Sequence, residues 1–145
     1  DIVSTMGDIA VEEMDHFRRV HQKIEERGLK LGWERKDQYV HDLAKFFVRT
    51  HDRRLNLVNK LLLSAMIEAR SCERFRVLSK NINDKDLAEF YHELMISEGE
   101  HYKTFINLAR KHGEGVVDVD DLWEKFLKYE AEIIAELGTK ELIHG

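Results

Sequence analysis

The chain of 145 residues contains no proline, and its apolar residues recur every three or four positions over long stretches. Proline inside a helix removes a backbone hydrogen bond and clashes with the preceding turn, so a chain without it can form long, unbroken helices. Apolar residues at this spacing line one face of a helix. No stretch makes a convincing strand. The sequence therefore predicts an all-α fold.

Five helices are expected from the periodicity and from the residues that bound it. Gly28 is placed to end the first helix, and the others begin after short polar residues, whose side chains accept hydrogen bonds from the first helical amides. These capping candidates are Asp37, Asp52, Asn83 or Asp84, and Asp118. The expected helices span residues 4–27, 37–49, 52–79, 84–113 and 118–137. The length suits one domain with a substantial core, and no linker composition divides it, so we expect a single domain over residues 1–145.

Two ionisable residues interrupt the apolar face of the helix expected around residues 87–109. Glu98 and His101 share that face with Leu87, Tyr91, Leu94, Phe105 and Leu108. Because they are three positions apart, the two side chains lie within one turn of each other, close enough to bind one ion. A charge on an apolar face is costly unless it has a partner. A single Glu-x-x-His is common in helices, however, as a surface Glu beside a hydrogen-bonded core His.

The same spacing occurs again near the start of the chain. Glu13 and His16 lie in the middle of another apolar face, which runs from Met6 to Ile24. A third carboxylate, Glu68, interrupts the apolar face of a helix between these two. Repetition makes coincidence less plausible, so these residues form a constellation of candidate ligands.

The turn near residues 80–83 folds two long helices back on each other and decides which carboxylates meet. Glu98 lies about 16 residues after the turn, so its neighbour should lie a similar distance before it, at 1.5 Å per residue. Glu68 is 14 residues before Ile82, whereas Glu73 is 9 residues before it and is rotated by about 140° from Glu68. We expect Glu68 to face Glu98, and Glu73 to lie at the surface or behind the ligands.

The types of residue in this constellation indicate the chemistry. Carboxylate oxygens with imidazole nitrogens, and no set of thiolates, suit iron or manganese better than structural zinc. Ferritin-like four-helix bundles bind two metal ions through one Glu from each of two helices and a Glu-x-x-His from each of the other two. The contributions of three of these four helices are present as Glu13, His16, Glu68, Glu98 and His101. The pattern predicts a ferritin-like up-down bundle with additional helices and a di-iron centre that reduces dioxygen.

Three stretches of the chain resemble the tRNA hydroxylases of the MiaE type, which are non-haem di-iron monooxygenases of the ferritin-like superfamily. They are EEMDHF, LLLSAMIEARSCERFRVLS and FYHELMISEGEHYKTFINLA. EARSCERF and SE-x-x-HY at this separation are much narrower signals than a generic Glu-x-x-His. The resemblance extends from about Met6 to Gly145.

This resemblance implies an activity, a cofactor and partners. Members of the family hydroxylate the isopentenyl group of 2-methylthio-isopentenyladenosine beside the anticodon of certain tRNAs. They use dioxygen and two electrons from an external reductase. The resemblance implies that five residues of this chain bind the two iron ions and take part in catalysis through the metal centre. These residues are Glu13, His16, Glu68, Glu98 and His101. For Arg70, Ser71, Cys72 and Arg74 the resemblance marks a position without a role.

The ferritin-like pattern also requires a carboxylate from a helix that precedes the first Glu-x-x-His. This chain begins at Asp1, without an initiator Met and about a dozen residues before Glu13. We therefore expect the first bundle helix to be absent from this sequence. The natural protein should carry about 40 to 60 further N-terminal residues, at 1.5 Å per residue for a bundle-length helix, that include a Glu ligand.

Composition favours a cytoplasmic protein with no membrane partner. No apolar run is long enough to cross a bilayer, and no signal-peptide pattern opens the chain. The lone cysteine, Cys72, cannot form an internal disulfide, and its place on an apolar face favours an inert, packed thiol.

The charge of the chain bears on whether it can bind tRNA. The formal net charge of −5 is unusual for an RNA-binding protein, but residues 45–80 hold nine Lys or Arg against three acidic residues. This segment is a candidate surface for phosphates, and a solvated helix face is an equally good interpretation. The arginines we expect to approach phosphates are Arg49, Arg53, Arg54, Arg74 and Arg76.

Two other classes of function stay open. Another ferritin-like di-iron protein, for iron oxidation and storage or for peroxide reduction, would need cage assembly or a rubredoxin-like module, and the chain has no Cys-x-x-Cys. In a metal-free helical binding module the Glu and His residues would merely satisfy one another. Iron analysis separates the metal-free class from the others.

Overall fold

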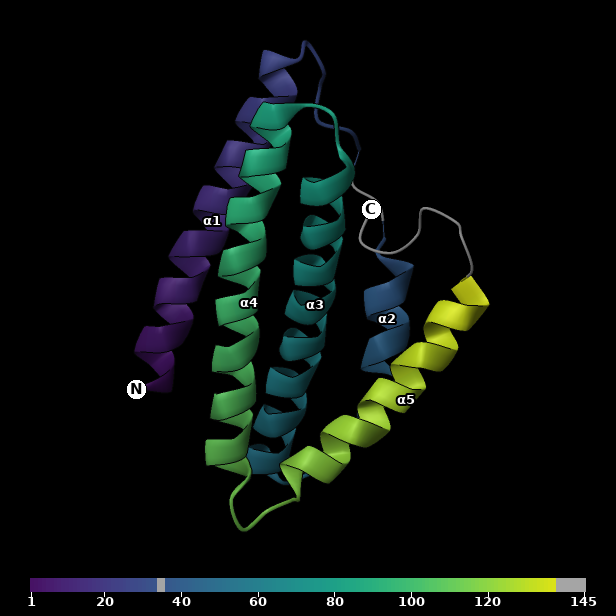
Figure 1. Ribbon diagram of the computed structural model, residues 1–145. Helices are drawn as coiled ribbons and strands as arrows, with labels where there is room; N and C mark the ends of the chain where they lie inside the picture. The colour runs from purple at the N-terminus through teal and green to yellow at the C-terminus, as the bar shows by residue number, and fades with distance from the viewer. Residues whose placement is uncertain (34–35, 138–145) are drawn as a thin grey trace. The chain divides into compact units, whose positions relative to one another are not determined.

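A computed structural model of the chain describes residues 1–33 and 36–137. All regular secondary structure in these residues is helical, which confirms the all-α prediction. The helices are α1 (Ile2–Glu26), α2 (Gln38–Ala44), α3 (Arg53–Asn81), α4 (Lys85–Gly113) and α5 (Val119–Leu137) (Figure 1). None of the helices that the structure describes is long and apolar enough to cross a membrane.

The chain divides into two compact units, Asp1–Lys36 and Asp37–Gly145. The first contains α1, which is capped by the Asp1 side chain through a hydrogen bond from the amide of Val3. It stops beside Gly28, whose φ of 68° is readily adopted by a residue without a Cβ. None of the residues of α1 is buried, so this helix has no apolar core within its own unit. The single domain expected from the sequence stays a prediction.

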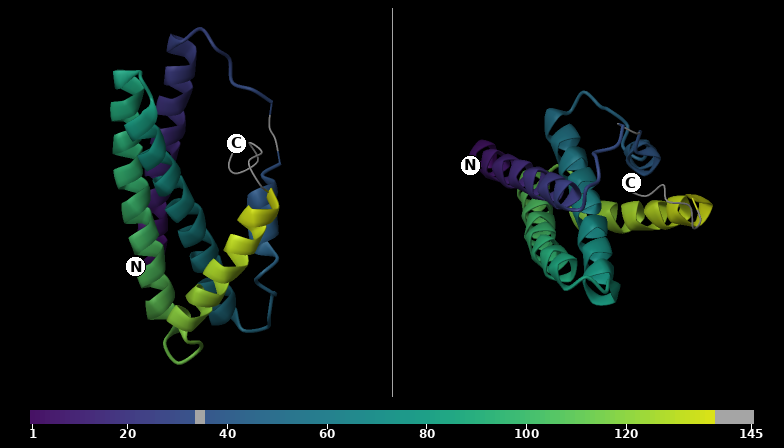
Figure 2. Two further views of the ribbon diagram at one scale, coloured as in Figure 1. Left: turned by 45° about the vertical axis from the view of Figure 1, so that its right-hand side comes forward. Right: turned by 90° about the horizontal axis from the view of Figure 1, so that it is seen from above.

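The longest elements of the second unit are α3 and α4, which form an antiparallel hairpin (Figures 1 and 2). Asp52 caps α3 through bonds from amides of its first turn, as the sequence predicts, and Asp84, one of the two candidates for α4, caps that helix in the same way. At the open end of the hairpin, Arg54 donates hydrogen bonds to the carbonyl oxygens of His112 and Glu114, at 3.2 and 2.7 Å. A cation is favourable there because the C-terminus is the negative end of a helix dipole. These bonds hold the first turn of α3 against the last turn of α4.

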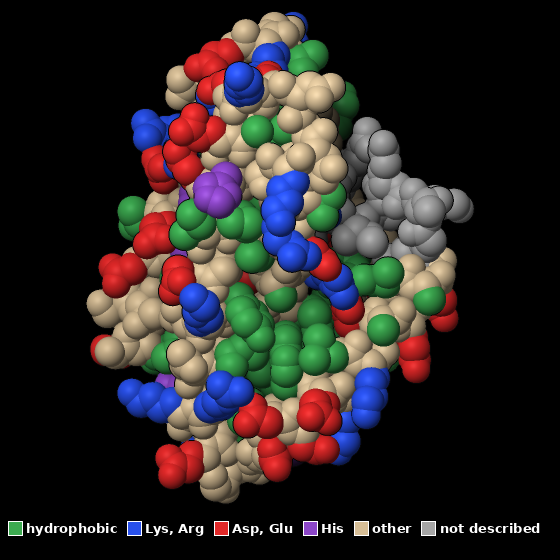
Figure 3. Space-filling view, viewed as in Figure 1, with side chains coloured by type: hydrophobic (Ala, Val, Ile, Leu, Met, Phe, Trp, Pro, Cys, Tyr) green, Lys and Arg blue, Asp and Glu red, His purple; other side chains and the backbone are tan. Residues whose placement is uncertain are grey.

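A second layer, made of α2 and α5, packs beside the hairpin through an aromatic and aliphatic core. The amide of Asp121 bonds to the Asp118 side chain, which caps α5 as expected. Figure 3 shows hydrophobic side chains gathered between the hairpin and α5, bordered by acidic and basic ones. The fully or nearly buried residues of this core are Tyr39, Leu43, Met66, Phe126 and Ile133.

The helix expected over residues 37–49 is wrong beyond Ala44, where α2 ends. The amides of Phe46 and Phe47 bond to carbonyls three residues back, so the chain tightens into turns. These turns bring both rings onto Phe126, with centroids 5.0 and 4.6 Å away. Aromatic packing in the core therefore outweighs the helical periodicity of this short segment, because local propensity is only a weak preference.

Gly113 marks a close approach at the end of α4, and its replacement by alanine is expected to destabilise the fold. A Cβ there would lie 2.4 Å from Cγ2 of Val119, so the buried contact would be overpacked. We expect Gly113→Ala to lower the free energy of unfolding by about 1–3 kcal/mol in urea denaturation. Gly7→Ala is the control, because a Cβ on Gly7 meets no described atom within 4 Å. Equal stability of the two variants would contradict the close approach.

Candidate metal centre

Three side chains of the α3–α4 hairpin converge on one point. Glu68 comes from α3, and Glu98 and His101 come from α4. Each offers a ligand atom, and these atoms lie within 4.8 Å of one another. Glu98 is 6% exposed and His101 4% exposed, so the α4 donors are shielded from bulk water. Two carboxylates and an imidazole in such a position form a candidate cation site.

The hairpin register explains why these residues meet. Glu98 and His101 are one helical turn apart, and Glu68 lies at their height because α3 and α4 run antiparallel from a short turn. Glu73 lies closer to the turn, is half exposed and forms an ion pair with Arg70. The structure therefore brings Glu68, not Glu73, to Glu98, as the spacing indicates. The assignment of these residues as metal ligands stays a prediction.

Glu13 and His16 form the corresponding pair in the first unit. They are three residues apart on α1, with His16 Nδ1 3.5 Å from Glu13 Oε1. The His16 side chain is 14% exposed and that of Glu13 44% exposed. The spacing predicted from the sequence thus places the two groups beside each other on one helix face. Their membership of a metal site is also a prediction.

The donor set of the hairpin fits a hard or borderline metal ion. Ligand atoms of Asp, Glu and His lie about 2.0–2.2 Å from metals such as zinc, so donors less than 5 Å apart can share an ion with small side-chain adjustments. Carboxylate with imidazole suits iron, manganese or zinc, and the absence of a thiolate among the three disfavours a structural cysteine site. The two carboxylates within 4.8 Å repel each other, and a bound cation would offset this repulsion.

Cys72 lies beside this cluster without belonging to it. Its Sγ donates a hydrogen bond to the carbonyl oxygen of Met95, at 3.3 Å. Burial, with a further contribution from the Glu98 carboxylate, raises the pKa of the thiol. A thiol with a raised pKa is a poor nucleophile at neutral pH, which agrees with the inert role expected from the sequence. A Cβ on Gly99 would lie 3.6 Å from Sγ, an ordinary van der Waals contact, so the thiol packs against this part of α4.

A buried carboxylate in α5 was not predicted from the sequence. Glu130 is 1% exposed and accepts hydrogen bonds from the Tyr39 hydroxyl, at 2.9 Å, and from Nη2 of Arg70, at 2.7 Å. Burial, together with the Glu130 carboxylate, raises the pKa of Tyr39, so the phenol stays a donor. The hydrogen bond to Glu130 likewise raises the pKa of the Arg70 guanidinium. This network joins α2, α3 and α5 and gives Arg70 a structural role.

The signal for Glu130 was present in the sequence. It lies four residues after Phe126 and three before Ile133, both of which are buried on the same helix face. An ionisable residue inside an apolar face was the criterion that identified Glu68 and Glu98, and it applies equally here. The partner in this case is an arginine rather than a candidate metal site.

A family model and two related proteins assign the chain to the same family. The model of the family described as tRNA-(MS[2]IO[6]A)-hydroxylase (MiaE) matches residues 1–145. The chain is 37% identical over 114 residues to a Pseudomonas putida protein, covering 79% of this chain and 54% of the relative. It is 33% identical over 136 residues to a Salmonella typhimurium protein, covering 94% and 47% respectively. Both relatives are named tRNA 2-(methylsulfanyl)-N(6)-isopentenyladenosine(37) hydroxylase.

A solved structure supports the predicted ferritin-like helix-bundle class. It is "Protein 43 with aldehyde deformylating oxygenase activity from Synechococcus", with a TM-score of 0.80 and 26% identity, over 92% of this chain and 65% of that one. The chain spans about half the length of the curated relatives it matches. Because the family model covers its whole length, the chain belongs to the MiaE family of tRNA hydroxylases.

Proposed function

We propose that this protein is a non-haem di-iron monooxygenase that hydroxylates the isopentenyl group of 2-methylthio-isopentenyladenosine in tRNA. The observation that carries the proposal is the buried cluster of Glu68, Glu98 and His101 in a chain of the MiaE family. Both relatives are named for this nucleoside, and the structural neighbour is named for an oxygenase activity. A tRNA substrate implies work in the cytoplasm.

The stoichiometry of hydroxylation determines which co-substrates the enzyme requires. Insertion of one oxygen atom into a C–H bond consumes dioxygen, two electrons and two protons, and yields the alcohol and water. The iron ions supply the activation of dioxygen, which no amino-acid side chain provides. The electrons come from an external reductase, which we propose as a second partner besides the tRNA.

Within this chain the proposed ligands have distinct contributions. The carboxylates of Glu68 and Glu98 can each contact one or two ions through oxygen, whereas the imidazole of His101 supplies a nitrogen donor. Burial of the α4 donors keeps water from the reacting centre and holds their rotamers by packing. Leu94 and Phe105 lie one turn before Glu98 and one turn after His101 and are buried on α4, so they offer apolar surface to an isopentenyl group, which has no polar atom.

Glu13 and His16 are proposed as the remaining ligands from this chain. Their spacing repeats that of Glu98 and His101, and the ferritin-like pattern uses two such pairs. Together with Glu68, the two pairs give three carboxylates and two imidazoles. Iron titration of Glu13→Gln and His16→Ala tests this assignment, since each is expected to lower the amount of bound iron.

The experiment that tests the function is analysis of tRNA nucleosides. A strain that lacks the gene should accumulate the unhydroxylated nucleoside, and the wild-type gene should restore the hydroxylated one. A gene that encodes His101→Ala should fail to restore it. If the deletion strain retains the hydroxylated nucleoside, the proposed function is wrong, and iron storage or peroxide reduction becomes the better assignment for the same cluster.

A further inference from the structure

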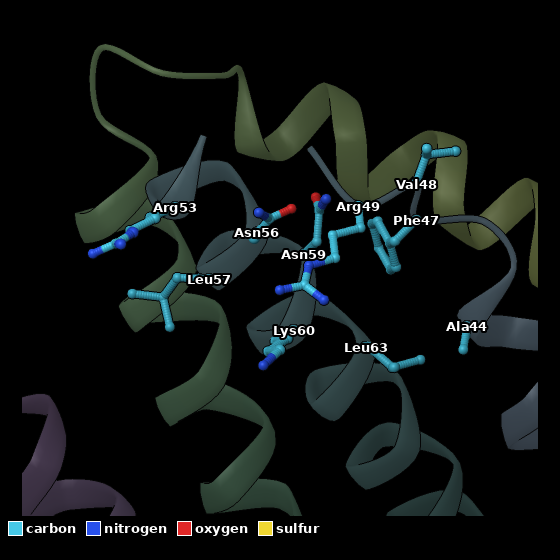
Figure 4. Close-up of a pocket in the computed structure, with 10 residues that line it drawn as sticks. All are labelled: Ala44, Phe47, Val48, Arg49, Arg53, Asn56, Leu57, Asn59, Lys60 and Leu63. Carbon is cyan, nitrogen blue, oxygen red and sulfur yellow. The ribbon is translucent and has the colours of Figure 1, made fainter. Parts of the chain in front are cut away.

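A basic groove lies at the start of α3, away from the candidate metal centre. It has a volume of about 520 Å³ and is bounded by the segment that follows α2 and by the first turns of α3. In Figure 4 the Arg49 guanidinium points toward Lys60 across the face of α3, and Arg53 extends past Leu57 on the other side. A second hollow shares Arg49 and Arg53 with it.

The charge of this groove is of one sign. Its lining includes Arg49, Arg53 and Lys60 and contains no Asp or Glu. The nearest carboxylate in the sequence, Asp52, accepts hydrogen bonds from the amides of Arg54 and Leu55 as the cap of α3. The side chains of Arg49 and Lys60, which approach each other in Figure 4, repel one another without a carboxylate between them, and a bound anion would relieve that repulsion. The groove is therefore electrostatically complementary to a polyanion.

The walls of the groove are held in place before any ligand arrives. Asn56 accepts a hydrogen bond from the amide of Thr50, at 2.9 Å, and donates one to its carbonyl oxygen, at 2.7 Å. Phe47, which forms another wall, packs against Phe126 of the core. Binding to such a rigid surface costs less conformational entropy than binding to a mobile loop.

Contacts within the unit reduce the number of basic residues in segment 45–80 that can bind phosphate. Arg54 is bonded to carbonyl oxygens at the end of α4, and Arg70 is bonded to Glu130. Arg74 is half-buried, and burial lowers its pKa. Arg54, Arg70 and Arg74 are therefore bonded or half-buried within the fold. Arg49 and Arg53, by contrast, are exposed and line the groove. Arg76 is also exposed, but it lies toward the other end of α3 and lines neither hollow, so the predicted arginines that line the groove are Arg49 and Arg53.

We propose that this groove binds the phosphate backbone of the RNA substrate through Arg49, Arg53 and Lys60. The identity of the polyanion rests on the proposed function, because a tRNA hydroxylase must hold a tRNA. Lys60 precedes Glu68 by eight residues on α3, which is about 12 Å along the helix axis at 1.5 Å per residue. The groove then lies about two helical turns from Glu68, so the phosphates it holds are expected to belong to nucleotides close to the modified one. Base-independent contacts of this kind position the RNA rather than read its sequence.

The test is RNA binding by a charge-neutralised variant. The triple substitution Arg49→Gln, Arg53→Gln and Lys60→Gln removes the three cations. The matched control removes three exposed lysines elsewhere in the same unit, through Lys111→Gln, Lys125→Gln and Lys128→Gln. Each protein is titrated with an unmodified anticodon stem-loop RNA by fluorescence anisotropy at several salt concentrations, and its iron content and circular dichroism are recorded.

The groove variant is expected to bind the RNA roughly tenfold or more weakly than the control. The slope of log affinity against log salt should fall by about 2, because each phosphate contact with single-stranded RNA contributes about 0.7. Iron content should be unchanged in both. Equal affinity and equal slope for the two triple variants would show that the groove does not bind RNA phosphates. The hydroxylase assignment would be unaffected, because the nucleoside analysis tests it separately. If the groove variant loses both affinity and helical signal, the single variant Lys60→Gln separates unfolding from the loss of phosphate contacts. In this folded variant the slope of log affinity against log salt should fall by about 0.7.

Discussion

Replacement of His101 by alanine, or of Glu98 by glutamine, is expected to lower iron affinity by more than about 100-fold and to abolish tRNA hydroxylation. Changes to groups that only support a ligand cost 10–100-fold in metal affinity, so loss of a ligand itself should cost more. Glu98→Gln keeps the volume of the buried side chain and removes its charge. Helical content by circular dichroism should stay near the wild-type value, with iron measured by a colorimetric assay after gel filtration.

The control for this pair is Glu100→Gln on the same helix. Glu100 is two residues from Glu98 but is exposed and paired with Lys103, so its change should leave iron content and activity intact. In chelator-treated protein, Glu98→Gln should be at least as stable as the wild type, because it relieves repulsion from Glu68. Full iron content in both Glu98→Gln and His101→Ala would show that the cluster is not the metal site.

Loss of the Glu130 carboxylate is expected to have the largest effect on stability. Glu130→Ala leaves the Arg70 guanidinium and the Tyr39 hydroxyl without their buried acceptor and opens a cavity. Breaking a buried ion pair in this way costs about 3–5 kcal/mol. The lower end applies here, because the Arg70 side chain is 30% exposed and keeps its pair with Glu73. Urea denaturation should show a loss of about 3 kcal/mol, with a fall in Tm of about 10 °C.

Two further variants separate the ion pair from the general effect of changing α5. Glu132→Ala, on the exposed side of the same helix, should change the free energy of unfolding by less than about 0.5 kcal/mol. The double change Arg70→Met with Glu130→Leu should recover part of the lost stability, since apolar pairs of similar volume often replace buried ion pairs without cost, while the buried Tyr39 hydroxyl still lacks its acceptor. A Glu130→Ala protein as stable as the Glu132→Ala protein would show that the network contributes little.

Much of the hairpin was predictable from local rules. The positions of Asp52 and Asp84 bounded α3 and α4, and the 1.5 Å rise per residue then set which carboxylates share a height. That calculation chose Glu68 over Glu73, and the structure places them accordingly. Glu98 and His101 followed from one turn of helix. Such inferences succeed because they depend on helix geometry and on a short connection, not on long-range packing.

The parts that were not predicted depend on contacts between segments far apart in the sequence. α2 ends early because Phe46 and Phe47 turn onto Phe126, which belongs to α5. Glu130 was missed because its partners, Tyr39 and Arg70, lie on two other helices. The periodicity of one helix shows which residues face inward, but it does not show what they will meet there.

The short connection formed by residues 82–84 also has a consequence for the order of events in folding. Closing a small loop costs little chain entropy, and contacts between sequence neighbours form faster than contacts between distant segments. Glu68, Glu98 and His101 are therefore expected to meet early, as soon as α3 and α4 zip together from the turn. An ion that binds at this stage adds its binding free energy to a partly folded chain, because metal affinity and folding are linked. A longer connection at this turn would delay metal uptake even if the final coordination were unchanged.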